Sequence, residues 1–130
     1  MKKLQNILLI ILFATVAQQT VAQSYVLNDN TSWKFTNNTS KTYTFLCPGQ
    51  TLSFDIYLPG SCTGTLTIKD DNGNQIYSQN LYDIANKFSG KTVSINSLSI
   101  NQAAKQIIFS IGGGTLEKTV SNVKITQLTY

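Results

Sequence analysis

Apolar and polar residues alternate along this chain, and the alternation is the feature that most restricts its fold. In the segment 51–58 the even positions are Leu52, Phe54, Ile56 and Leu58, and polar or amphipathic residues stand between them. Successive side chains of a β-strand point to opposite faces, so such a strand has one apolar face that must be covered. The pattern recurs at 66–68, 93–95 and 107–111. We therefore predict an all-β fold, a two-sheet antiparallel β-sandwich, with a closed barrel as the alternative.

Turn residues separate the alternating segments. Pro-Gly pairs occur at 48–49 and 59–60, and an Asn-Gly pair, which is typical of tight hairpins, occurs at 72–73. Helical patterns are limited to two short stretches, 82–88 and 101–106. The expected strands lie near residues 24–27, 32–36, 42–46, 51–58, 64–69, 75–80, 91–95, 106–111 and 120–129.

The N-terminus has the composition of a cleavable signal peptide. Lys2 and Lys3 precede an apolar run at 7–16, and small residues at 20–22 offer a cleavage site after Ala22. A second Thr-Val-Ala at 15–17 offers an alternative cleavage site, so the sequence does not decide between the two. The run is shorter than the roughly 20 residues that a membrane-spanning helix needs, and no Cys comes directly after the small residues at 20–22 to carry a lipid. We expect a signal peptide at 1–22 and one β-sandwich domain at 24–130. The expected location is secreted, periplasmic or cell-surface, with no membrane insertion after cleavage.

Charge argues against nucleic acid as a partner. Removal of Lys2 and Lys3 with the signal peptide leaves eight lysines against six acidic residues, and the chain has no Arg. Arginine is the preferred residue for bidentate contacts to phosphates and bases. The remaining lysines are scattered singly, so the sequence predicts a nearly neutral surface rich in hydroxyl and amide groups.

No catalytic arrangement can be found in the sequence. The chain has no His, the commonest general base and metal ligand, and its one Glu is Glu117. Asp70 and Asp71 are adjacent in an expected turn, where solvated turn residues are favoured over a catalytic pair or a calcium loop. Asp55 lies mid-strand on the outward face, where an exposed polar role is favoured over catalysis. We expect no enzymatic activity, no catalytic residues, no cofactor and no assignable metal ligands.

The two cysteines, Cys47 and Cys62, leave one question open. A disulfide is the default expectation for an exported chain. The strand expected between them would span roughly 26 Å at about 3.3 Å per residue, whereas a disulfide needs Cα atoms within about 7 Å. Whether the two residues are bridged is not decided by the sequence.

A ligand surface is predicted from the outward-facing residues of neighbouring strands. Asp55 and Tyr57 alternate on the face of their strand that the core does not use. Lys69 is expected outward on the next strand, and Tyr77 follows across the Asn-Gly hairpin. These four residues are the predicted ligand-binding set. Trp33 shares a face with an apolar neighbour two residues away and is expected in the core; an ordinary solvated sheet is the alternative for the whole surface.

The middle and the end of the chain resemble jelly-roll carbohydrate-binding modules, which are galactose-binding-domain-like β-sandwiches. The resemblance implies a jelly-roll sandwich, glycan binding through exposed aromatic rings, and a structural calcium ion whose ligands the sequence does not assign. The segments that carry it are TYTFL at 42–46, PGQTLSFD at 48–55, GTLTI at 64–68, IIFS at 107–110 and SNVKIT at 121–126.

Three functions follow in order of preference. The first is a non-enzymatic exported β-sandwich that binds glycans through its outward polar and aromatic face. The second is a structural or adhesive cell-envelope protein whose partner is another protein that pairs at a strand edge. The third is a small hydrolase, which the missing catalytic groups disfavour.

Overall fold

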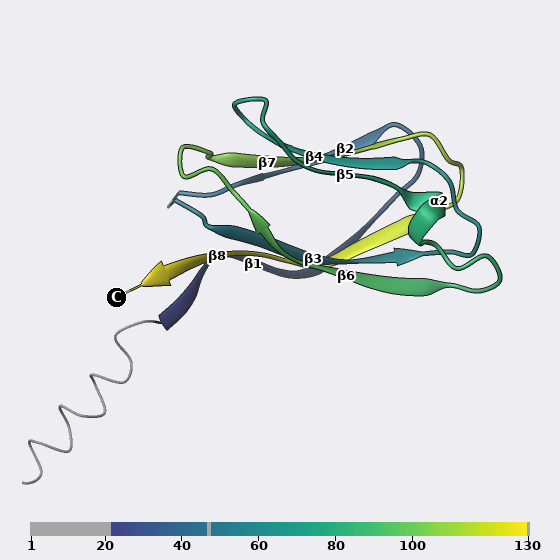
Figure 1. Ribbon diagram of the computed structural model, residues 1–130, viewed down its shortest axis with the longest axis horizontal. Helices are drawn as coiled ribbons and strands as arrows, with labels where there is room; N and C mark the ends of the chain where they lie inside the picture. Colours follow the sequence, from purple (N-terminus) through teal and green to yellow (C-terminus); the bar gives the residue numbers. More distant parts are fainter. Residues whose placement is uncertain (1–21, 47, 130) are drawn as a thin grey trace, which may run out of the picture.

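The computed structural model describes residues 22–46 and 48–129, so the signal peptide expected at 1–22 lies outside the described residues except for Ala22. Two four-stranded antiparallel sheets face each other, and the described residues contain little other regular structure (Figure 1). The prediction of an all-β, two-sheet sandwich is confirmed.

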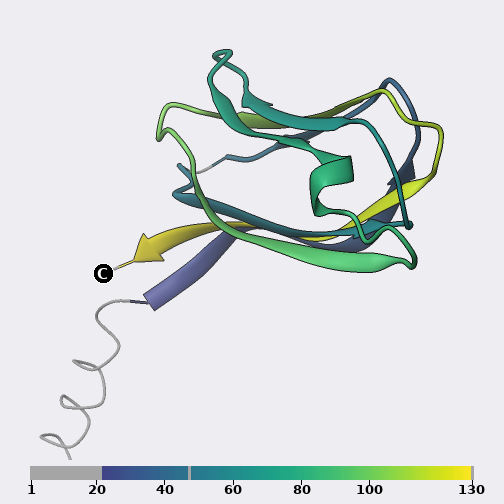
Figure 2. The same cartoon turned by 45° about the vertical axis from the view of Figure 1, so that its right-hand side comes forward.

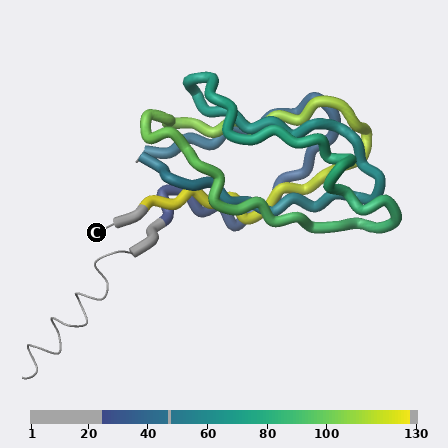
Figure 3. Tube along the Cα trace, in the orientation of Figure 1, coloured from purple at the N-terminus to yellow at the C-terminus, as the bar shows by residue number. Residues whose placement is uncertain are grey.

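The first sheet, called sheet A here, contains both the first and the last strand. Its order is β1-β8-β3-β6, and every neighbouring pair is antiparallel. The early and late parts of the chain therefore run side by side (Figure 3). Its strands are β1 (Ala22–Phe35), β8 (Lys118–Thr129), β3 (Thr51–Leu58) and β6 (Lys91–Ser99).

The second sheet, sheet B, has the order β2-β7-β4-β5. The chain crosses between the sheets at most connections, and only β4 and β5 follow each other within one sheet. The Asn-Gly pair forms that hairpin, as expected. The strands of sheet B are β2 (Thr39–Thr44), β7 (Gln106–Gly112), β4 (Thr65–Asp70) and β5 (Gln75–Asn80).

A helical turn, α2 (Leu81–Ile84), connects β5 to β6 at one end of the sandwich (Figure 1), and this end comes forward in Figure 2. The side chain of Asn80 caps it by accepting a hydrogen bond from the Tyr82 amide at 3.0 Å. Leu81 is fully buried and anchors the turn against the core. The helix is shorter than the stretch expected at 82–88, and the stretch at 101–106 contains no helix.

One strand is longer than expected because irregular pairing continues it. The segments expected at 24–27 and 32–36 belong to one strand, β1, whose pairing with β8 shifts between Tyr25 and Leu27 and between Asp29 and Ser32. At the second shift the Asp29 carboxylate accepts hydrogen bonds from both the amide and the hydroxyl of Thr31. A β-bulge adds a residue to one strand without ending the sheet, so the polar segment at 28–32 does not break it.

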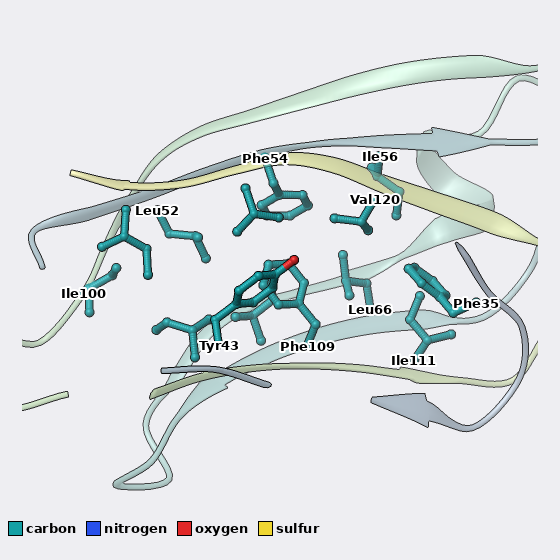
Figure 4. Packing of buried hydrophobic residues seen from close by; sticks show 14 of the residues in the cluster. Phe35, Tyr43, Leu52, Phe54, Ile56, Leu66, Ile100, Phe109, Ile111 and Val120 are labelled. Atoms are coloured by element: carbon teal, nitrogen blue, oxygen red, sulfur yellow. The ribbon is translucent and has the colours of Figure 1, made fainter. Parts of the chain in front are cut away.

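The apolar faces of both sheets meet in one core (Figure 4). Leu52, Phe54 and Ile56 of β3 are buried, as the alternation predicts. Phe109 of β7 lies between the sheets and makes edge contacts with the rings of Phe54, Trp33 and Tyr43 at centroid distances of 5.1, 5.6 and 5.7 Å. The expectation that Trp33 packs on the core is confirmed, and its indole NH donates to the Tyr43 hydroxyl at 2.6 Å.

The turn at 70–74 corrects one expectation. Asp70 is buried rather than solvated, and its carboxylate accepts hydrogen bonds from the amides of Asn72 and Asn74, each at 2.9 Å. Asp71 is exposed and accepts from the amide of Lys105 at 2.8 Å. Both carboxylates therefore hold backbone in place, which explains their position in the hairpin.

Cys62 is a free thiol buried in the core, and burial raises its pKa. Cys62 forms no disulfide bond, whereas Cys47 lies outside the described residues. Among the described residues, no helix is both long enough and apolar enough to span a bilayer.

Candidate binding face

The structure separates the four residues predicted to form one ligand surface. Asp55 and Tyr57 lie on the outer face of β3 in sheet A, whereas Lys69 lies on β4 and Tyr77 on β5, both in sheet B. The chain crosses from one sheet to the other between β3 and β4, so the outer faces of these two strands point in opposite directions. The expectation of a surface shared by all four residues is therefore wrong.

Tyr77 departs further from the prediction because it faces inward. It pairs with the buried Ile68 across the β4–β5 hairpin, and its ring makes an edge contact with Phe54 of the opposite sheet at 6.2 Å. Desolvation by burial raises the pKa of the Tyr77 hydroxyl. Tyr77 belongs to the core, and Lys69 remains exposed on the outer face of sheet B.

The outer face of sheet A contains a hollow of about 370 Å³, called the sheet A hollow here. It lies across the ends of β1, β8, β3 and β6, and most of its side chains end in a hydroxyl, an amide or an ammonium group. It is lined by Tyr25, Thr51, Ser53, Asn96, Ser97, Lys124 and Thr126.

Two bulges beside β3 shape this face. Ser97 on β6 and Asn122 on β8 have positive φ angles of 59° and 53°, which residues other than glycine rarely adopt. The pairing of β3 with both neighbours shifts near Ser53, and the Ser53 hydroxyl accepts a hydrogen bond from the Ser97 amide at 3.2 Å. A bulge bends its strand and increases the twist of the strand. Because the two bulges lie on either side of β3 next to Ser53, they produce a concave surface there.

Asp55 joins three strands of this face. Its carboxylate accepts hydrogen bonds from the Ser94 hydroxyl of β6 at 2.7 Å and from the Asn122 side-chain amide of β8 at 2.8 Å. The bond from Asn122, followed by that from Ser94, lowers the pKa of the Asp55 carboxyl below its ordinary value. Asp55 is therefore ionised at neutral pH and holds the bulged region together.

Tyr25 and Lys124 form the aromatic and charged side of the hollow. Half of the Tyr25 surface, 50%, is exposed, and the Lys124 ammonium lies 5.6 Å from the centroid of its ring. A cation at this distance over an aromatic face is attracted by the electron density of the ring. Beside them, the hydroxyls of Thr51 and Thr126 share a hydrogen bond between β3 and β8.

Tyr57 lies on the same face as the hollow but farther along β3. It is four residues from Ser53, a distance of about 13 Å along an extended strand. Its hydroxyl packs against Gly90, where a Cβ atom would lie only 1.9 Å away. Glycine at position 90 therefore lets the exposed ring of Tyr57 lie close to the backbone.

Within the described part of the chain, no group of three or more His, Cys, Asp or Glu side chains could hold a metal ion. The hollow instead offers groups that donate and accept hydrogen bonds, one exposed ring and one ammonium. Sequence reasoning missed Tyr25, Asn96 and Lys124, because these residues come together only when the strand order is known.

No protein-family model matches the chain, and no curated protein matches it in sequence. Solved structures do match. The K3 cleaved adhesin domain of Lys-gingipain from Porphyromonas gingivalis aligns with 80% of this chain and 100% of its own, with a TM-score of 0.56 and 12% identity. A putative alpha-L-fucosidase from Bacteroides ovatus aligns over 87% of this chain with a TM-score of 0.50 and 19% identity. The chain corresponds to only 19% of that enzyme.

A third match is the C-terminal family 6 carbohydrate-binding module of LamC, a marine laminarinase from Zobellia galactanivorans. It covers 82% of this chain and 99% of its own, with a TM-score of 0.49 and 13% identity. The strand orders β1-β8-β3-β6 and β2-β7-β4-β5 give the chain a jelly-roll fold, and the adhesin domain matches it over its whole length. The resemblance seen in the sequence is thus confirmed for the fold, and at these identities it concerns the fold alone.

Proposed function

We propose that this protein is an exported, non-enzymatic domain that binds glycans on the outer face of sheet A. The observation that carries the proposal is the sheet A hollow, in which an exposed aromatic ring lies beside hydroxyl, amide and ammonium groups. Asp55 and Tyr57, predicted as ligand residues, continue this face along β3. The hollow would hold the ligand, and these two residues would extend the contact.

Sugar chemistry fits these groups. A pyranose has apolar C–H faces and a rim of hydroxyls that both donate and accept hydrogen bonds. An exposed tyrosine ring contributes apolar area at a low cost in conformational entropy, and Thr, Ser and Asn side chains act as both donors and acceptors. The face lies on strands rather than on loops, so its groups are held in place before the ligand arrives.

A second candidate is a structural or adhesive envelope protein that binds another protein. The observation in its favour is the superposition on an adhesin domain, together with Phe88, which is 94% exposed in the loop before β6. A single exposed ring is small compared with an ordinary protein interface, so we prefer the glycan proposal.

Affinity electrophoresis in gels that contain soluble polysaccharides tests the proposal on the secreted chain. Tyr25→Ala should weaken binding by about tenfold, the effect of losing about 1.4 kcal/mol of contact energy, and Tyr57→Ala should weaken it less. Tyr82→Ala is the matched control, because Tyr82 has similar exposure but lies in α2, away from sheet A's outer face. Absence of retardation by any polysaccharide, or an equal loss with Tyr82→Ala, would contradict the proposal.

A further inference from the structure

We infer that the ligand of the sheet A hollow is an acidic glycan, with a uronate carboxylate that pairs with Lys124. The inference rests on the proposed glycan-binding function and narrows its ligand class. It starts from the charge of the lining residues. Lys124 is the only charged residue among the seven, and the other six are neutral and polar or aromatic. The hollow therefore presents one positive charge and no carboxylate of its own.

The Lys124 ammonium is available for a ligand. In the described part of the chain the one ion pair is that between Lys34 and Glu117, at 3.6 Å, so Lys124 has no carboxylate within ion-pairing distance. Instead its ammonium lies over the ring of Tyr25. This contact favours conformers of the long and flexible side chain that keep its ammonium group at the wall of the hollow. A positioned cation loses less entropy when it binds an anion.

Asp55 is the acidic group that interacts electrostatically with Lys124. It does not line the hollow, and each of its carboxylate oxygens already accepts a hydrogen bond, from Ser94 and from Asn122. Those donors offset part of its negative charge. Asp55 therefore stabilises the bulged face without competing directly for the ammonium protons of Lys124.

The neutral lining residues select a sugar over a bare anion. A carboxylate on a ring that also has hydroxyls could pair with Lys124 while the hydroxyls bond to the side chains of Ser53, Ser97 and Asn96. A hydrogen bond to a charged group is about twice as strong as a neutral one, so the carboxylate would contribute most to the affinity. A neutral polysaccharide could use only the weaker contacts.

Polygalacturonate, its fully methyl-esterified form and poly-glutamate are the probes that test this inference. Binding is measured by affinity electrophoresis and by calorimetry at low and at moderate salt. Polygalacturonate should bind at least about tenfold more tightly than the ester, and Lys124→Gln should remove that preference. Lys124→Arg should restore it. Lys69→Gln is the matched control, because Lys69 is an exposed lysine on the outer face of the opposite sheet.

Other results would contradict either the acidic-ligand inference alone or the glycan-binding proposal as well. Equal binding of the ester and the free acid, with loss on Tyr25→Ala but not on Lys124→Gln, would overturn the acidic ligand and leave the glycan proposal standing. Binding of poly-glutamate as tight as that of polygalacturonate, or an equal loss with Lys69→Gln, would show unspecific attraction and overturn the inference. Failure of every polysaccharide to bind would overturn the inference and the proposed function together.

Discussion

At the scale of single residues, Lys118 is the least expected side chain in the molecule. It is fully buried at the start of β8, and among the described residues its Nζ atom has no hydrogen-bond partner. Desolvation lowers the pKa of Lys118, while the Cys62 thiol opposes the shift. Burial of a charge without a partner costs free energy, so Lys118 destabilises the fold and favours its own neutral form.

Lys118→Met should therefore stabilise the protein, by about 1–3 kcal/mol at pH 7, because it keeps the apolar stem and removes the buried amine. The gain should shrink as pH rises. Between the lowered folded pKa and the ordinary value of 10.5, the unfolded chain binds a proton that the folded chain lacks. Lys118 therefore destabilises the native protein less as pH rises across this window.

Urea denaturation of the native protein and the variant between pH 7 and pH 10 measures both effects. Tyr43, whose raised pKa affects stability at higher pH, is present in both proteins, so its contribution cancels in the difference. A variant that is less stable, or a difference that does not change with pH, would contradict the assignment.

The candidate site shows what alternation can predict about single residues. The alternation of apolar and polar residues correctly placed Asp55 and Tyr57 on the outer face of β3, because side chains alternate between the two faces within any single strand. It placed Tyr77 outward wrongly, since the β4–β5 pairing shifts between Ile68 and Lys69 and the ring packs on Phe54. Tyrosine is amphipathic, so its identity does not reveal its face.

At the scale of elements, the loop at 113–117 between β7 and β8, which begins with Gly113 and Gly114, is constrained by its neighbours. Gly114 has a φ of 82°, and a Cβ atom there would lie 2.2 Å from the Thr63 carbonyl oxygen and 2.7 Å from Lys118 Nζ. Gly73 in the β4–β5 turn has a similar φ of 83°, but a Cβ there would meet nothing within 4 Å. Substitution of Gly73 therefore tests backbone strain alone, whereas substitution of Gly114 tests backbone strain together with a steric clash.

Gly73→Ala should lower the free energy of unfolding by about 1–2 kcal/mol, which is the cost of a left-handed conformation for alanine. Gly114→Ala should cost at least about 1 kcal/mol more, because the clash with the Thr63 carbonyl requires the loop backbone to move. Thermal and urea unfolding of the two variants provide the comparison. Equal losses would show that the loop adjusts freely and that the close approach of Thr63 has no energetic consequence.

The sequence predicts the regular parts of the strands better than their irregularities. The bounds of β3 and β5 match the expectation, because turn residues stand on both sides of β3 and before β5, and Asn80 at the end of β5 caps the helix that follows. The bulges that shape the sheet A hollow centre on Ser97 and Asn122, and neither position carries a glycine that would have revealed a positive φ. The hollow could therefore not be predicted, since its shape comes from pairing between strands that are distant in sequence.

At the scale of the whole molecule, the order of the strands limits what the sequence could predict. The two-sheet architecture follows from one apolar face per strand, which requires a second layer. The assignment of strands to layers does not follow, because inward-facing residues look alike in both sheets. The crossing between β3 and β4 placed the predicted ligand residues on two different sheets. The hollow, in contrast, is lined by residues of β3 and β6 together with residues of β1 and β8, which are far apart in the sequence.

The same crossings should make the sandwich unfold as one unit, with Phe109 at its centre. Its ring contacts Phe54 and Trp33 of sheet A and Tyr43 of its own sheet, so Phe109→Ala removes contacts between the layers. The free energy of unfolding should fall by about 3–5 kcal/mol. Phe88→Ala is the control, because a ring that is 94% exposed should change it by at most about 0.5 kcal/mol.

Two probes follow the unfolding of these variants. Trp33, the single tryptophan of the chain, reports the packing between the sheets, and far-ultraviolet circular dichroism reports the strands. Since neither sheet can cover its apolar face alone, both probes should give the same midpoint in the native protein and in Phe109→Ala. Separate midpoints would show that one sheet persists without the other, and a small loss for Phe109→Ala would place the main contact between the layers elsewhere.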